Sequence, residues 1–287
     1  MSSHTTSSLG ILAGHGDLVQ SIIQTCIQEK RPYFIIAFEG QTDPALVQSH
    51  PHAWHRLGGL GDVLRTLKSK DIQDIVMIGG IQRPSLFDLS PDLYTAKLLA
   101  RIGLKGIGDD GLLRFLVEEL EKEGFCVKGI QDIMGGDRIL LPAGALGVFL
   151  PEDLSLRSDI RLGIRIARTL GALDVGQSVM VDQGLVLGVE AIEGTDSLIE
   201  RASHLKKLRL PNASSSGVLV KLCKPEQERR VDLPTLGVTT LKLLKDGGFK
   251  GVVGEASKTL LVDKEEMKVY ADKEALFIWG MTREDKW

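Results

Sequence analysis

The sequence is poor in cysteine and nearly balanced in charge, and each of these features argues against a class of protein. Its three cysteines, Cys26, Cys126 and Cys223, are far apart and form no C-x-x-C pair of the kind that binds zinc or performs redox chemistry. Such thiols are typical of a reducing, cytoplasmic compartment. The formal net charge of −3 at pH 7 argues against a general nucleic-acid binder, because such proteins carry a basic excess or a basic stripe.

Long apolar runs are also missing. The first apolar segment stops at Gly14, and the polar residues 1–8 before it contain no basic region. We therefore expect neither a signal peptide nor a membrane span. Together with the cysteine pattern, this predicts a protein that stays in the cytoplasm.

The signatures of several hydrolase classes are absent as well. The sequence has no G-D-x-x-D with a later G-N-H-D, as two-metal phosphoesterases have, no Nudix-type acidic cluster and no G-x-S-x-G nucleophile elbow. Its six histidines lack the H-E-x-x-H spacing of a zinc site, and His50, His52 and His55 are typical of a solvated loop. A hydrolase with this sequence needs another arrangement of charged residues.

Length and composition predict an α/β protein with two domains. The 287 residues exceed one typical hydrophobic core, and 43% hydrophobic with 25% charged residues is ordinary for a globular protein. Prolines and glycines between Pro142 and Pro151 indicate a linker. We predict a Rossmann-like α/β domain with a mostly parallel sheet at 1–146, an α/β catalytic domain at 147–287, and a substrate bound between them.

The N-terminal half alternates between strands and helices. Short apolar runs predict strands at 9–13, 33–38 and 75–78, and apolar residues at helical spacing predict helices at 18–29 and 60–69. This alternation is typical of parallel pairing in a doubly wound sheet.

Glycines follow two of these strands. Ligands of doubly wound sheets bind at the carboxyl ends of strands, so we expect Gly14 to share a rim with Gly79 and Gly80. The turn from Gly14 resembles a dinucleotide fingerprint, but Val19 stands where the third glycine belongs, which makes the NAD signal weak. The turn either offers N–H groups to a phosphate or is only a tight turn.

Two adjacent acids, Asp109 and Asp110, precede a helix expected at 112–123. Asp109 is a candidate N-cap. The alternative is a metal ligand, because Mg2+ binds one or two carboxylates together with waters and substrate phosphates. Strands expected at 125–130 and 138–141 complete this half.

The C-terminal half opens with an amphipathic helix expected at 155–170. Its apolar residues Ile160, Ile164 and Ala167 are predicted to face inward. Four arginines at steps of three and four residues form a stripe on the other side, namely Arg157, Arg161, Arg165 and Arg168. Such a stripe is usually a solvated face, and the alternative is contact with an anionic membrane surface.

A hairpin and a helix start come next. The alternating run after Val175 predicts two strands joined by a turn at 182–184, the second ending at Glu190. Residues 193–196 then predict a helix capped by Thr195 or Asp196. Capping explains Thr195, whereas Glu190 lies at a strand end where a substrate could dock. Further strands are expected at 218–222, 251–254, 260–262 and 276–279, and helices at 238–245 and 264–272.

The most charged segment of the chain lies at 224–237. Its two prolines disfavour helical angles in the residues before them, so we expect a constrained turn. Lys224, Arg229 and Arg230, with Lys221 just upstream, can neutralise phosphate oxygens. Asp232 could hold a divalent metal or position a water. The alternative is a solvated surface turn.

Three sequence runs together resemble one known family. They are VGQSVxVxxGxVLxVEAIEGTD at 175–196, KxxKPxQxxRVDLPTxG at 221–237 and GGIxRP at 79–84. Together these runs resemble the cytoplasmic UDP-2,3-diacylglucosamine pyrophosphatases of the lipid A pathway. The similarity extends from about Leu9 to Gly280. The resemblance implies Mg2+-dependent hydrolysis of the diphosphate of UDP-2,3-diacylglucosamine to UMP and 2,3-diacylglucosamine 1-phosphate.

The resemblance also implies roles for individual residues. Asp232 is the expected catalytic residue, as a metal ligand or as the group that orients water, and Glu190 and Asp109 are further candidate metal ligands. The candidate substrate-binding residues are Gly14, Gly79, Gly80, Gln177, Gly194, Thr195, Asp196, Lys224, Arg229, Arg230 and Thr235.

The acylated substrate leaves open a peripheral position of this cytoplasmic protein on the inner face of the inner membrane, and a homodimer stays open as well. The net charge argues against a nucleic-acid partner. Two other function classes stay open as well. One is a protein that binds a nucleotide-sugar without cleaving it, and the other is a Rossmann-type oxidoreductase. Binding without turnover would identify the first, and a spectral response to a nicotinamide cofactor the second.

Overall fold

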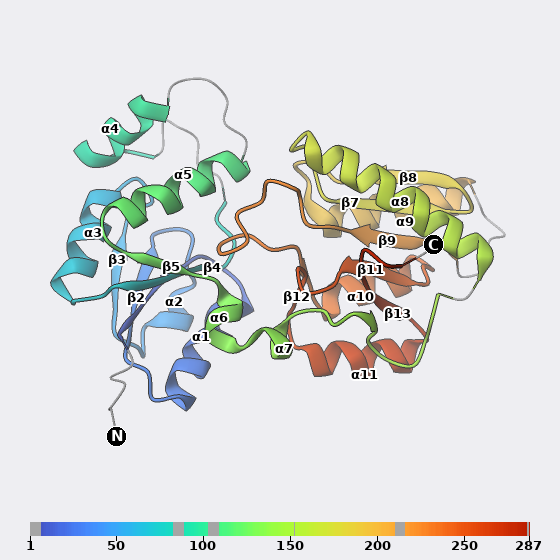
Figure 1. Cartoon of the computed structure of the whole chain (residues 1–287), viewed down its shortest axis with the longest axis horizontal. Coiled ribbons are helices and arrows are strands. Elements are labelled where there is room, and N and C mark those ends of the chain that lie inside the picture. Colours follow the sequence, from blue (N-terminus) through green and yellow to red (C-terminus); the bar gives the residue numbers. More distant parts are fainter. Residues whose placement is uncertain (1–6, 83–88, 103–108, 152, 210–215, 286) are drawn as a thin grey trace. The chain divides into compact units, whose positions relative to one another are not determined.

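The computed structural model describes residues 7–82, 89–102, 109–151, 153–209, 216–285 and 287, and the chain divides into two compact units (Figure 1). The first unit comprises Met1–Gly135 with Glu228–Val231, and the second comprises Gly136–Gln227 with Asp232–Trp287. The division after Gly135 precedes the linker expected at 142–151.

The first unit is a parallel five-stranded sheet with strand order β3-β2-β1-β4-β5. Its strands are β1 (Leu9–Ala13), β2 (Tyr33–Phe38), β3 (His52–His55), β4 (Asp74–Ile78) and β5 (Cys126–Lys128). Its helices are α1 (Asp17–Gln28), α2 (Pro44–Val47), α3 (Leu60–Ser69), α4 (Leu93–Ile102), α5 (Asp109–Lys122) and α6 (Ile130–Met134).

Helices cover both faces of this sheet. On one face, Leu67 of α3 and Val117 and Leu120 of α5 pack with Leu12 and Ile36 of the strands. Figure 1 shows α1 and α6 on the opposite face. All of β1 is therefore buried, as a central parallel strand should be.

The second unit has a mixed six-stranded sheet with order β6-β13-β11-β9-β7-β8. Its strands are β6 (Gly144–Ala145), β7 (Ser178–Asp182), β8 (Leu185–Val189), β9 (Val218–Lys221), β11 (Gly251–Glu255) and β13 (Phe277–Met281), and β10 (Thr235–Leu236) pairs separately with β12 (Leu260–Leu261). Strands β9, β11 and β13 are parallel, whereas β6, β7 and β8 add antiparallel pairs. Its helices are α7 (Gly136–Ile139), α8 (Leu154–Ala172), α9 (Gly194–Arg209), α10 (Val238–Asp246) and α11 (Lys264–Glu274).

Helix α8 lies on one face of this sheet and the other long helices on the opposite face. Ile160, Ile164 and Ala167 of α8 pack on Val179 and Val220, which confirms the inward face expected from helical spacing. The second apolar cluster joins α9, α10 and α11 to the other side of the same strands. No helix among the described residues is long and apolar enough to span a bilayer.

The hairpin predicted after Val175 is confirmed, and its turn is fixed in two ways. Gln183 and Gly184 have positive φ angles of 50° and 77°, as a two-residue turn of this hand requires. Their N–H groups both donate to the carboxylate of Asp159 on α8, at 2.8 Å and 2.7 Å. Burial raises the pKa of Asp159, and the two backbone donors oppose that shift.

Two sequence predictions of secondary structure are wrong. Of residues 138–141, expected as a strand, the first two end the short helix α7, and Leu140 forms only an isolated bridge with Leu260. The histidine-rich segment expected as a loop contributes β3, which pairs with β2 so that Ile35 lies opposite His52 and Phe38 opposite His55. The backbone pairing available at the edge of the sheet outweighs the polar character of this segment.

Candidate active site

One edge of the second sheet gathers polar side chains that are far apart in the sequence. The register of β7 and β9 places Ser178, the first residue of β7, opposite Lys221, the last residue of β9. Strand β8 returns beside β7 and ends at Val189, so Glu190 leaves the sheet at the same edge. The chain then enters α9, whose first turn contains Thr195.

A buried lysine joins these elements. The Lys221 ammonium donates to Thr195 Oγ1 at 2.8 Å and to the carbonyl oxygen of Thr235 at 2.9 Å. Thr195 Oγ1 in turn donates to Glu190 Oε1 at 2.8 Å, and the Gln177 N–H lies 3.4 Å from Glu190 Oε2. The edge therefore contains a continuous chain from cation to hydroxyl to carboxylate, as buried charges require.

The electrostatic environment of Lys221 is unusual. Burial lowers its pKa, and the negative charges of Glu190, Asp196 and Asp232 oppose that shift. Glu190 is buried, Asp196 is exposed and Asp232 is partly buried. A desolvated cation within range of several specific carboxylates is typical of a functional site.

Asp232 is held by a glutamine within its own loop. Gln227 Nε2 donates to Asp232 Oδ2 at 2.6 Å. The other end of the amide, Gln227 Oε1, accepts from the Lys224 N–H at 3.0 Å and from Cys223 Sγ at 3.2 Å. Gln227 is buried, so the orientation of the Asp232 carboxylate is fixed from the protein side.

The bases of the charged loop have different partners. Lys224 Nζ lies 2.7 Å from Asp174 Oδ1 in the second unit. Arg230 belongs to the first unit, where it pairs with Glu228 at 2.9 Å and with Glu121, and Glu228 raises its pKa most strongly. Arg229 is exposed. Roles of Lys224, Arg229 and Arg230 toward phosphate stay predictions.

Helix α9 begins at Gly194, whose positive φ of 80° favours glycine. Thr195 and Asp196 consequently lie inside the first turn, and the Thr195 hydroxyl donates to Glu190. The prediction that Thr195 or Asp196 caps this helix is therefore wrong. The amino end of a helix of this length carries partial positive charge, which suits the predicted role of Gly194, Thr195 and Asp196 toward an anionic substrate.

In the first unit, the glycine rim is closed by its own backbone. Gly14 N donates to Ile78 O at 2.8 Å, and His15 and Gly80 exchange two hydrogen bonds of 2.9 Å. A Cβ on Gly14 would lie 2.2 Å from Gly80 O, so glycine is needed there for the close approach. The N–H groups of Gly14 and Gly80 thus already donate to backbone oxygens, which favours the tight-turn interpretation of this rim. Arg83 and Pro84 of the GGIxRP motif lie outside the described residues.

The three candidate metal ligands, Glu190, Asp109 and Asp232, differ in their surroundings and in how far the structure describes them. Both Glu190 oxygens interact with protein donors, the side chain of Asp109 lies outside the described residues, and Asp232 is partly exposed. Within the described part of the chain, no three His, Cys, Asp or Glu side chains come together to hold a metal. This donor set fits a Mg2+ ion held by one or two carboxylates and substrate phosphates, and it does not fit a closed protein cage.

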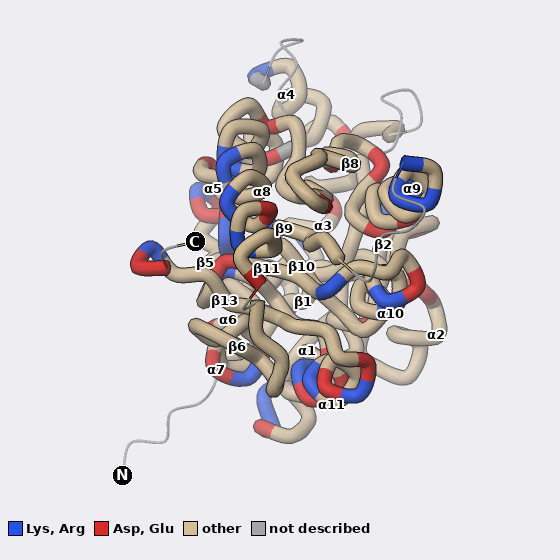
Figure 2. Tube along the Cα trace, turned by 90° about the vertical axis from the view of Figure 1, so that its right-hand side faces the viewer, with Lys and Arg blue, Asp and Glu red and all other residues tan. Residues whose placement is uncertain are grey.

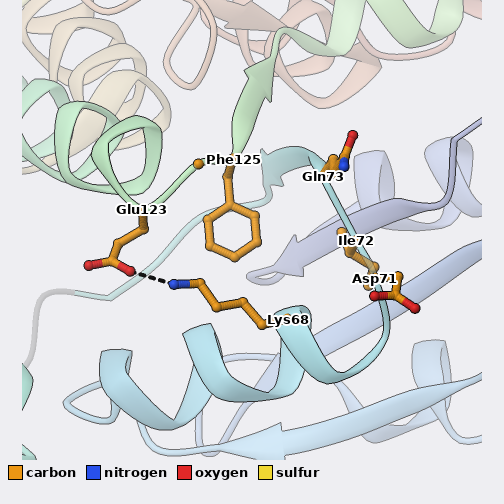
Figure 3. Close-up of a pocket in the computed structure, with 7 residues that line it drawn as sticks. Lys68, Asp71, Ile72, Gln73, Glu123 and Phe125 are labelled. Atoms are coloured by element: carbon orange, nitrogen blue, oxygen red, sulfur yellow. Dashed lines mark hydrogen bonds and ion pairs between the residues drawn. The ribbon is translucent and has the colours of Figure 1, made fainter.

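A small pocket of about 220 Å³ lies at the amino ends of β4 and β5 in the first unit (Figure 3). Residues 71–73 and 123–125 line it, immediately before β4 and β5. Lys68 and Glu123 form an ion pair of 2.6 Å at its side. Because ligands of such sheets bind at the opposite, carboxyl ends of strands, we assign this pocket no role.

Sequence reasoning missed part of the cluster. Lys221 was expected to neutralise substrate phosphate, yet its ammonium is buried and bonded to Thr195 and Thr235. Gln227, which fixes Asp232, was not expected to have a role at all. A polar residue directly after the apolar run of β9 is the signal that could have indicated burial of Lys221.

Comparison with known proteins identifies the family. Models of the LpxI N-terminal domain and the LpxI C-terminal domain match residues 8–136 and 142–279. A Caulobacter vibrioides protein named UDP-2,3-diacylglucosamine pyrophosphatase LpxI is 36% identical over 280 residues, which are 97% of this chain and 99% of that protein.

Among solved structures, the biotin carboxylase domain of a Hydrogenobacter thermophilus 2-oxoglutarate carboxylase covers 71% of this chain and 42% of that chain, at 12% identity and a TM-score of 0.22. That likeness is too low to inform fold or function. The family models and the Caulobacter relative, in contrast, span both halves of the sequence. The chain belongs to the LpxI family.

Proposed function

We propose that this protein is a hydrolase that cleaves the diphosphate of UDP-2,3-diacylglucosamine, releasing UMP and 2,3-diacylglucosamine 1-phosphate for lipid A biosynthesis. The observation that carries the proposal is the identity of 36% to a protein named for this activity, across 97% of this chain. The polar edge of the second sheet supports it, because it combines a buried cation, carboxylates and a helix amino end in one place.

The reaction needs a water aligned on phosphorus and charge to offset the phosphate oxygens. In this proposal Asp232, held by Gln227, orients the attacking water or binds Mg2+. The ion, when bound, would polarise the diphosphate and stabilise the departing phosphate. Lys221 acts indirectly. Its ammonium donates to Thr195, which donates to Glu190, so its charge fixes both residues at the amino end of α9.

The remaining expected contacts follow from the same placement. Gln177 and Thr235 join the network described above through backbone atoms, and Gln177 Oε1 is buried without a hydrogen-bond partner among the described residues. Thr235 Oγ1 donates to Leu233 O at 3.0 Å and can still accept. A cytoplasmic location, peripheral contact with the inner membrane and a homodimer accompany the proposal as predictions.

The test is release of UMP from UDP-2,3-diacylglucosamine, measured with Mg2+, with the metal chelated, and in Asp232→Asn. We expect turnover that requires Mg2+ and falls at least about 100-fold in the variant, while substrate binding measured by calorimetry persists. Substrate binding without turnover by the intact protein would instead identify a nucleotide-sugar binding protein. A nicotinamide-dependent absorbance change would identify an oxidoreductase.

A further inference from the structure

The outward face of α8 is positively charged from Arg157 to Arg168. Four exposed arginines share it, namely Arg157, Arg161, Arg165 and Arg168. At about 100° per residue they fall within about 80° of the helix circumference, and Leu154 lies in the same sector. We call these five residues the α8 face. Figure 2 shows the resulting stripe of basic residues along α8.

No acidic side chain of α8 itself lies on this face. The acidic residue of the helix, Asp159, is buried on the opposite side against the hairpin turn. Among the residues that the structure describes, none of the four arginines pairs with a carboxylate side chain. Arg157 Nε donates to Pro151 O at 3.2 Å, and Arg161 donates to a backbone oxygen of Trp287.

Helix α11 of the same unit shows what an ordinary solvated face looks like. It mixes Lys and Glu along its length, and Lys268 lies 3.0 Å from Asp272. Lys273 lies 3.8 Å from Glu274. Figure 2 shows both signs of charge on α11 and a row of basic residues along α8. A one-sign face repels itself unless an external anion offsets it.

Exposed apolar side chains lie at both ends of α8. Leu154 is 80% exposed in its first turn, and Leu173, directly after its last turn, is 69% exposed. Phe149 and Leu150, just before the helix, are 38% and 47% exposed. A partner that offers only charge, such as a nucleic acid, would give these side chains nothing to bury. An apolar layer beneath an anionic surface satisfies both requirements.

We propose that the α8 face docks on the surface of an anionic lipid bilayer, with the arginines at the headgroups and the flanking apolar side chains at the acyl boundary. Each basic residue near such a surface strengthens binding by about fivefold. The biological reason for docking rests on the proposed function, since a diacylated substrate resides in a membrane. The binding of an anionic bilayer itself rests on the α8 face alone.

Sedimentation of the full-length protein with vesicles tests this without substrate. Vesicles of phosphatidylcholine alone are compared with vesicles that also contain phosphatidylglycerol. We expect binding to the anionic vesicles only, falling steeply as salt is raised, and about 30-fold weaker in Arg165→Gln/Arg168→Gln. Leu154→Ser should weaken binding less, and in a way that salt does not change.

The matched control is Lys268→Gln/Lys273→Gln, which removes the same charge from the mixed face of α11. Its vesicle binding should equal that of the parent. Equal losses in the α8 and α11 variants, equal binding to neutral vesicles, or binding to duplex DNA but to no vesicle would overturn the proposal. UMP release from detergent-dispersed substrate reports separately on the proposed function, so the two can fail independently.

Discussion

The two sheets of this protein end in edges of opposite chemical character. In the first unit the carboxyl ends of β1 and β4 meet through backbone alone, with Gly14 bonded to Ile78 and His15 to Gly80. In the second unit the corresponding edge contains Lys221 and Glu190, both buried. Strand order indicates where a ligand can bind, but the side chains at that edge decide whether chemistry follows.

The difference has an energetic side. A backbone crossing such as that of Gly14 and Gly80 stabilises its own turn and leaves no desolvated charge. The Lys221 cluster keeps a buried cation and carboxylate that packing alone would not favour. A buried cation within range of several carboxylates, as at Lys221, is more typical of a functional site than a single buried ion pair, and we therefore propose that the chemistry lies in the second unit.

The largest effect is expected for Lys221→Met. Loss of the ammonium removes the positive charge that interacts with the buried Glu190 carboxylate, which should lower the free energy of unfolding by about 3 kcal/mol. It should also lower kcat of the folded fraction at least about 100-fold, measured with UMP release below the unfolding transition.

Lys206→Met provides the matched control for Lys221→Met. Lys206 is equally buried in the same unit, where its ammonium lies 2.9 Å from Asp182 Oδ2 and donates to Gly248 O at 2.7 Å. We expect a similar loss of stability with kcat unchanged in the folded fraction. Equal kcat losses in both variants would show that Lys221 is structural only.

Gly14→Ala should destabilise the first unit without touching the chemistry. Its Cβ would meet Gly80 O at 2.2 Å, and a backbone atom cannot move aside as a side chain can. We expect a loss of about 2–3 kcal/mol in urea unfolding, with KM and kcat of the folded protein unchanged. A selective rise in KM would instead indicate that this rim binds substrate. Gly16→Ala, where a Cβ meets nothing within 4 Å but φ 107° and ψ 166° lie in a region open almost only to glycine, should cost about 1–3 kcal/mol from backbone strain alone.

Gln227→Leu separates the orientation of Asp232 from its presence. The variant loses the amide that donates to Asp232 Oδ2 at 2.6 Å, so the carboxylate can rotate. We expect kcat to fall about tenfold with KM little changed, measured by steady-state UMP release. An unchanged kcat would mean that the substrate or metal alone positions Asp232.

The smallest effect concerns acid sensitivity of the first unit. Burial lowers the pKa of His55, while Asp62 and Glu39 oppose that shift. Because the pKa of His55 is lower in the folded than in the unfolded state, the unfolded state binds more protons as the pH falls. The contribution of His55 to the free energy of unfolding is therefore fully present above about pH 6.5 and is lost as the pH falls toward the folded pKa. Urea midpoints of His55→Gln should therefore change less than those of the parent between about pH 7 and about pH 5. An identical slope would assign the acid sensitivity to other groups.

Much of the fold follows from local sequence pattern. The apolar runs of β1 and β2, the helical spacing of α3 and the hairpin turn at Gln183 each predict the observed element. Two elements were missed for different reasons. Strand β3 is polar and forms because β2 offers a free edge. Helix α7 lies where the apolar pattern resembles a strand.

The site was less predictable for a physical reason. Its members come from four separated segments, and only the antiparallel register of β7 and β9 brings Ser178 and Lys221 together. Sequence motifs do indicate Thr195 and Asp232, because both lie in charged runs after strands. The burial of Lys221 and the amide bridge of Gln227 depend on side-chain packing that no local pattern contains.

The most direct test of the central claim compares one acid from each unit in a single-turnover assay. UMP release with Mg2+ present and enzyme in excess over UDP-2,3-diacylglucosamine is measured for Asp232→Asn and for Asp109→Asn, the acid that sequence alone offers as a ligand in the first unit. If the chemistry resides at the edge of the second sheet, Asp232→Asn should be slower by at least about 100-fold and Asp109→Asn should match the parent. The reverse result, with Asp109→Asn inactive and Asp232→Asn active, would contradict the assignment.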